Sequence, residues 1–314
     1  MKKFKFFNYD PPKKGVEKSD ERASVQTDFL GFFIMYGRKF WNISNLNLFM
    51  AIYVLFVALG VWKLSPYPIA FYVFLGISIL LFGLINLSST YVTRGYVRGD
   101  PVYILSDIKY SISKNYKQGI IMGIVDALVI FLLIFDIIFW SGVDTTKLNE
   151  ISEGTDALQH ITEVATEQNQ DENADTDAVE KTVNNSFIES ICYYSSIFML
   201  IIYMFMRNYI YLLMVTFKLS IFKILKNSFI FAFLGIKRNI LAALGIAATC
   251  LINIFIFVYI PMVGIILPLI ITLSTCTFIG SYAAYPTIKK YMITPYYKEN
   301  EEFNTYDKVF EDRG

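Results

Sequence analysis

The chain has 314 residues, of which 55% are hydrophobic, 17% aromatic and 18% charged, with a formal net charge of +1. Soluble domains carry about 25% charged residues, so this balance excludes an ordinary water-soluble globular protein. Long uncharged runs alternate with short charged stretches, which is the pattern of helices that span a bilayer. The composition therefore predicts an integral membrane protein.

The N-terminal segment, residues 1–44, carries nine lysines and arginines and contains the pair Pro11 and Pro12. A cleavable signal peptide needs a short apolar region near its start, and none is present. We expect this segment to be cytoplasmic and the first membrane helix to act as an uncleaved signal.

Six apolar segments follow, each close to the ~20 residues that cross a ~30 Å hydrocarbon core. They cover residues 46–64, 67–92, 119–140, 190–215, 240–260 and 262–284. Backbone groups in lipid must be bonded within their own segment, so these segments are expected to be helices. The predicted fold is an all-α polytopic membrane helical bundle over residues 45–288, with amphipathic interfacial helices and a cytoplasmic tail over 289–314.

Basic residues define the orientation. All but three of the 28 lysines and arginines fall in segments that six crossings place on one side, the exceptions being Lys63, Lys147 and Lys181. The positive-inside rule then places both termini in the cytoplasm.

The outer loop, residues 141–186, has eleven acidic residues and only Lys147 and Lys181 as bases. Apolar residues between Leu148 and Val164 have near-helical spacing, which is compatible with a short amphipathic helix. Residues 166–185 are polar enough to be disordered.

Asp126 is the most informative single residue. It lies about 10 Å into the hydrocarbon, counted from Gly119 at 1.5 Å per residue, where an unpaired carboxylate costs several kcal/mol. It must therefore face the bundle interior, with Arg207 as the natural partner. Two interpretations stay open: a substrate or proton site, and an ion pair that clamps two helices.

Other intramembrane features favour helix packing. Asn86, Asn208 and Asn253 can bridge helices by hydrogen bonds, and Asn86 and Asn253 join Asp126 and Arg207 as a candidate intramembrane polar site. The small-residue pairs Gly119/Gly123 and Gly280/Ala284 allow close approach of helices. Pro268 is expected to kink the last helix and leave a carbonyl free.

The stretch 217–237 resembles an interfacial helix, with Phe222 and Phe229 on its apolar face. Lys218, Lys223 and Lys226 would meet anionic lipid headgroups, or alternatively a cytoplasmic partner. No enzyme, cofactor or metal site is expected, because the single histidine, His160, lies in the acidic loop and no phosphate-binding loop is present.

Short motifs carry a family resemblance. They are Asn45-Leu46-Asn47-Leu48, Ser88-Ser89-Thr90-Tyr91 leading to Arg94 and Arg98, Gly99-Asp100-Pro101, and the run Lys114, Asn115, Tyr116, Lys117 and Gln118. With these the chain resembles the YesL-like bacterial membrane proteins, a domain family of unknown function, over residues 30–290. The resemblance implies a bacterial plasma-membrane protein with an accessory or regulatory role in carbohydrate utilisation, but it supplies no catalytic residues.

Three functions therefore stay open. The first is an accessory component of carbohydrate uptake, whose partners are the lipid bilayer and a carbohydrate transporter component. The second is a small secondary transporter or channel with Asp126 in its pathway, and the third is a structural membrane scaffold. No nucleic acid partner is expected, and the sequence does not define an oligomeric state.

Overall fold

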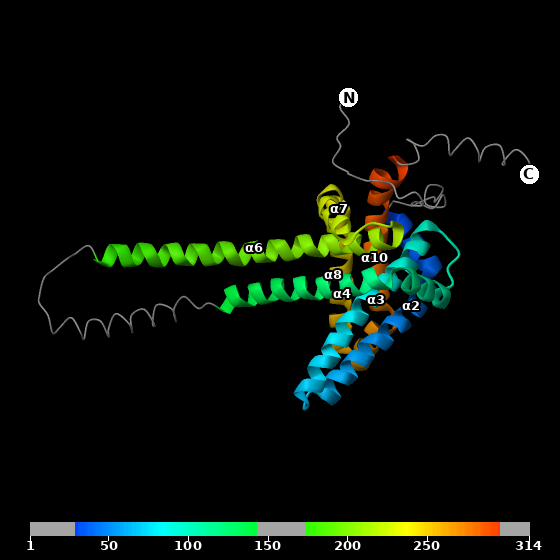
Figure 1. The fold of residues 1–314 in the computed structure, drawn as a ribbon, viewed down its shortest axis with the longest axis horizontal. Coiled ribbons are helices and arrows are strands. Elements are labelled where there is room, and N and C mark those ends of the chain that lie inside the picture. Colours follow the sequence, from blue (N-terminus) through cyan, green and yellow to red (C-terminus); the bar gives the residue numbers. More distant parts are fainter. Residues whose placement is uncertain (1–28, 143–173, 296–314) are drawn as a thin grey trace, which may run out of the picture. The chain divides into compact units, whose positions relative to one another are not determined.

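The computed structural model describes residues 29–142 and 174–295, and within these ranges all the regular structure is helical. Figure 1 shows the helices with their labels. In chain order they are α2 (Phe29–Leu64), α3 (Pro68–Arg98), α4 (Ile104–Gly142), α6 (Ala174–Thr216), α7 (Ile221–Leu234), α8 (Ile236–Tyr259), α9 (Pro261–Leu267), the π-helix η1 (Pro268–Thr272), α10 (Leu273–Ile288) and the π-helix η2 (Lys289–Ile293).

Six helical spans are long and apolar enough to cross a membrane. They are Phe29–Leu64, Pro68–Arg98, Ile104–Ser141, Ser190–Thr216, Ile236–Tyr259 and Pro261–Ile293. Each matches one of the six segments predicted from the sequence, with at most one residue of a segment outside its span. The all-α polytopic architecture is therefore confirmed.

The chain divides into two compact units. The larger comprises residues 1–126 and 203–314, and the smaller comprises residues 127–202. In the smaller unit, the Asp136 carboxylate accepts hydrogen bonds from Trp140 Nε1, at 3.1 Å, and from the Ser196 hydroxyl. All further features described below belong to the larger unit unless stated.

The first helix is longer than predicted. Residues 29–44, expected to be part of a cytoplasmic segment, form the first turns of α2. The reason is aromatic packing: the Phe32 ring lies 5.6 Å from that of Phe278 and 5.3 Å from that of Tyr282 in α10. Such pairs stabilise the contact beyond the area they bury.

Helix α6 corrects a second expectation. Residues 174–185, predicted to be disordered, are helical because α6 begins at Ala174. Extending an existing helix avoids the cost of nucleating a new one, so a polar sequence can continue a membrane helix outward. The amphipathic helix expected near residues 148–164 lies outside the described residues.

Helix α10 is the centre of the larger unit. It packs against α2, α3, α7 and α8, and α2 packs along α3; in Figure 1, α2 and α3 are the blue and cyan helices that run side by side. Phe278, Tyr285 and Ile288 of α10 are fully buried. The core is thus built around the last membrane helix.

The end of α3 is defined by its sequence. Pro68 occupies the first turn, where its missing N–H costs nothing. Gly99 ends the helix with φ of +81°, and the Asp100 N–H donates to Gly95 O at 3.0 Å. Arg94 and Arg98, which follow the predicted apolar segment 67–92, are therefore in the last turns of α3.

Helices α3 and α4 cross at glycines. An ideal Cβ on Gly83 would lie 2.7 Å from the Cα of Gly123 and would overlap the carbonyl oxygen of Gly119. The pair Gly119/Gly123 therefore has the packing role that its spacing predicted, with Gly83 of α3 as its partner.

Pro268 interrupts the last membrane helix as predicted, and a π-helical turn, η1, begins there. The freed backbone groups are bonded by α2. Asn47 Nδ2 donates to Pro268 O at 2.9 Å, and Asn47 Oδ1 accepts from the Ser274 N–H at 2.8 Å. The Ser44 hydroxyl donates to Ile270 O at 3.1 Å. Side chains of α2 thus stabilise the irregular backbone.

We expect Asn47→Leu to lower the free energy of unfolding by about 1–2 kcal/mol, because it leaves a buried carbonyl and a buried N–H without partners. Asn45→Leu is the matched control, since Asn45 lies on the same helix but is exposed. Denaturant titration of both variants in mixed micelles checks this. Equal losses would contradict the role of Asn47.

Candidate intramembrane polar site

The Asp126 carboxylate of α4 is fully buried and bonded by three donors of α6. Tyr203 Oη donates to Oδ1 at 2.7 Å, Arg207 Nε to Oδ2 at 3.0 Å, and Tyr211 Oη to Oδ2 at 3.0 Å. The ion pair predicted from the sequence is present, and two tyrosines add to it. Together these residues form what we call the Asp126 cluster: Asn86, Asp126, Tyr203, Arg207 and Tyr211.

Arg207 links α4 to α3. Its Nη2 donates to Asn86 Oδ1 at 3.2 Å, and its guanidinium lies 5.1 Å from the centre of the Phe82 ring. Asn86 is held in turn, since its Nδ2 donates to Phe82 O at 2.8 Å. One cation therefore connects three helices.

Tyr203 and Tyr211 were not identified from the sequence. They flank Arg207 at spacings of four residues, so all three lie on one face of α6. A polar stripe at helical spacing, opposite a carboxylate on another membrane helix, is the signal that would have identified them.

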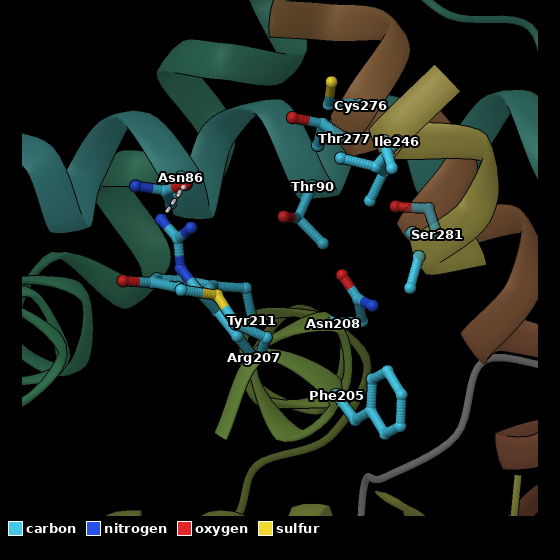
Figure 2. A pocket seen from close by; sticks show the side chains of 14 residues that line it. Asn86, Thr90, Phe205, Arg207, Asn208, Tyr211, Ile246, Cys276, Thr277 and Ser281 are labelled. Atoms are coloured by element: carbon cyan, nitrogen blue, oxygen red, sulfur yellow. Dashed lines mark hydrogen bonds between the residues drawn. The ribbon is translucent and has the colours of Figure 1, made fainter. Parts of the chain in front are cut away.

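A cavity of about 390 Å³ adjoins the cluster, within the size range of small-molecule sites. Figure 2 shows its lining. The polar members are Asn86 and Thr90 of α3, Arg207, Asn208 and Tyr211 of α6, and Cys276, Thr277 and Ser281 of α10. Arg207 reaches this space with 28% of its side chain exposed, whereas the side chain of Asp126 is 0% exposed. The cavity therefore meets the cation of the pair and not the carboxylate.

Two polar groups in this cavity lack partners within the described part of the chain. Neither the Thr90 hydroxyl nor the Asn208 amide is hydrogen-bonded there, and Figure 2 shows them on facing sides of the space. Thr90 is only 7% exposed. Unpaired polar groups in a cavity are suited to bind water or a polar ligand.

Asn253 does not join the cluster. Its Nδ2 donates to Thr249 O in its own helix at 2.7 Å, and its Oδ1 accepts from the Thr272 hydroxyl of η1 at 3.0 Å. Of the four residues considered for an intramembrane polar site, Asn86, Asp126 and Arg207 come together. Asn253 instead helps to hold the π-helical turn.

The short-motif residues Arg94, Arg98, Asn115 and Gln118 have structural positions or contacts. Arg94 is buried, and its Nη1 donates to Val215 O at 3.1 Å. Arg98 lies 3.0 Å from Asp100 in an ion pair. Gln118 Nε2 donates to Leu219 O at 2.8 Å. Asn115 is where α4 is kinked, with φ of −128° and ψ of 16°.

The basic face predicted near α7 is exposed. Lys218, Lys223 and Lys226 all face outward, as does Lys117 of α4. The buried face of α7 includes Ile224 and Phe231, whereas Phe222 is 77% exposed. Exposed lysines beside an exposed phenylalanine are typical of an interfacial helix.

The described residues contain no group of three or more His, Cys, Asp or Glu side chains arranged to hold a metal ion. What the cluster offers is a neutralised ion pair, hydrogen-bond donors and one cation at a cavity.

The fold and the site define an all-α, multi-pass membrane protein with a buried ion pair between its helices. Comparison with models of known protein families, with characterised proteins and with solved structures finds no match to this chain.

Proposed function

We propose that the protein is a non-enzymatic component of the bacterial plasma membrane that assists or regulates carbohydrate uptake, with both termini in the cytoplasm. The observation that favours this function over transport is that the Asp126 side chain is enclosed by the protein. Its side chain has no exposed surface and has three donors. An ionisable residue in a transport pathway needs contact with water or substrate.

The carbohydrate context is supported by the YesL-like motifs. The exposed lysines Lys218, Lys223 and Lys226 support a role in contact with lipid or a transporter component. Those side chains lie beside apolar groups that suit a membrane surface.

A small secondary transporter or channel is the second candidate, and the cavity beside Arg207 favours it. Its pathway would run past Arg207 and Asn208. Transport through that space requires water to reach Arg207 from a membrane surface and then to pass the cluster.

Thiol labelling in intact membranes separates the two candidates. In a background lacking Cys192, Cys250 and Cys276, we expect Asp126→Cys to be protected from a membrane-impermeant maleimide and Asp136→Cys to be labelled. Tyr203→Cys, which leaves the ion pair intact, is a second probe of the enclosed side and is also expected to be protected. Labelling of either Asp126→Cys or Tyr203→Cys would favour the transporter.

Transport itself is tested in proteoliposomes. We expect the purified full chain alone to move no sugar, while deletion of its gene lowers the initial rate of sugar uptake by cells. Sugar-specific flux in proteoliposomes containing only this chain would refute the accessory role. Unchanged uptake in the deletion strain on every sugar that the cells use would refute the link to carbohydrate.

A further inference from the structure

A second hollow lies between α2, α8 and α10, with a volume of about 490 Å³. Its walls are apolar, apart from two cations at one end. It is lined by aromatic residues of α2, by Lys237, Arg238, Ala242, Gly245 and Ala248 of α8, and by Ile279 of α10. We call it the α8 groove.

The length of the α8 groove matches one leaflet of a bilayer. From Arg238 to Ala248 a helix rises about 15 Å, at 1.5 Å per residue. The hydrocarbon core is about 30 Å thick, so each leaflet contributes about half of that. A single acyl chain that enters beside Arg238 would therefore end near Ala248.

Small residues of α8 make the groove deep. Ala242, Gly245 and Ala248 lie on one helical face, and an ideal Cβ on Gly245 would come no closer than 3.5 Å to Ile279. The outer walls, Leu241, Leu244 and Phe33, are exposed. The groove is thus open to the acyl chains of the bilayer.

Two cations lie at the charged end of the groove. Lys237 is exposed and Arg238 half-buried, and neither has a carboxylate partner in the part of the chain that the structure describes. Both lie in the first turn of α8, where the helix dipole also favours an anion. Basic pockets between membrane helices at the headgroup level suit anionic lipid.

We propose that the α8 groove binds one anionic phospholipid, with an acyl chain along Ala242, Gly245 and Ala248 and its phosphate at Lys237 and Arg238. The apolar walls suit an acyl chain, and the two cations suit a negatively charged headgroup. This site is separate from the Asp126 cluster and does not depend on the accessory role.

Native mass spectrometry of the full chain, released from detergent, tests this site. The probes are phosphatidylglycerol and phosphatidylcholine with the same acyl chains, and glycerol 3-phosphate as the headgroup without a tail. We expect one phosphatidylglycerol to be retained in preference to phosphatidylcholine. Equal retention of the two lipids would overturn the charge requirement, and equally tight glycerol 3-phosphate would overturn the phospholipid assignment.

Charge removal should weaken the complex. We expect Lys237→Gln/Arg238→Gln to lower the affinity for phosphatidylglycerol by roughly 30-fold, from about fivefold for each basic residue. Lys114→Gln/Lys117→Gln removes the same charge from exposed positions of α4 and should leave the affinity within about twofold. A similar loss in both double variants would overturn the site.

Filling the groove tests the acyl chain independently of charge. Gly245→Leu should lower the affinity for phosphatidylglycerol by roughly 10-fold or more, because leucine occupies volume that the chain would take. Gly76→Leu is the control, since an ideal Cβ there has no atom within 4 Å. Unchanged affinity in Gly245→Leu would show that no acyl chain lies against Gly245. A dimer of the protein that forms without added lipid would assign the groove to a second copy.

Discussion

Replacing Arg207 with leucine is expected to lower the free energy of unfolding by about 3–5 kcal/mol, the usual cost of removing one partner of a buried ion pair. The variant leaves the Asp126 carboxylate without exposed surface and with only Tyr203 and Tyr211 as donors. The desolvated charge, and not the lost contact alone, causes the effect. Reversible denaturant titration in mixed micelles measures it.

Two further variants show whether charge is the cause. Asp126→Leu/Arg207→Leu should recover most of the stability, because replacing both partners with apolar side chains is often neutral. Arg38→Leu removes an exposed arginine of α2 and should change stability by less than about 0.5 kcal/mol. A loss below about 1 kcal/mol in Arg207→Leu would show that the pair does not stabilise the fold.

Introducing valine at Gly83 is expected to cost about 3 kcal/mol or more, the upper end of the cost of overpacking. The new Cβ would lie 2.7 Å from Gly123 Cα and overlap the Gly119 carbonyl oxygen. These are backbone atoms, so no side chain can move aside and α3 must separate from α4. The midpoint of thermal unfolding and the denaturant titration should both decrease.

Gly76→Val provides the matched control on the same helix. An ideal Cβ at Gly76 has no atom within 4 Å, so this variant changes the intrinsic helix preference without a clash. We expect it to unfold near the wild-type midpoint. Losses of equal size at Gly76 and Gly83 would mean that helix propensity, and not the crossing, explains the effect.

The fold class follows from the sequence because the bilayer leaves few alternatives. Apolar runs of about 20 residues must be helical there, and the six spans match the six predicted segments to within one residue at the ends that fall short. Helix ends were predicted less well. Polar turns extend α6 back to Ala174. The apolar stretch 29–36, which the prediction left in the cytoplasmic segment, begins α2 and contacts Phe278 and Tyr282.

Of the candidate site, the ion pair of Asp126 and Arg207 could be predicted, because a buried charge needs an opposite charge. A carboxylate deep in an apolar helix requires a cation, and one membrane helix offered Arg207 at a suitable depth. The hydroxyl partners could not be ranked, because the chain has 22 tyrosines and only packing determines which face Asp126. Asn253 was grouped with the cluster for its polarity, but the π-helical turn uses its carbonyl oxygen.

The π-helical turn η1 has a geometric consequence for the last membrane helix. A π turn accommodates one extra residue, so everything after Thr272 is rotated by about 100° relative to an uninterrupted α-helix. Helix α9, before the turn, packs against α8, whereas α10, after it, packs against α2 and α3 as well. The phase shift lets one span present its packing surface in two directions at different depths of the bilayer.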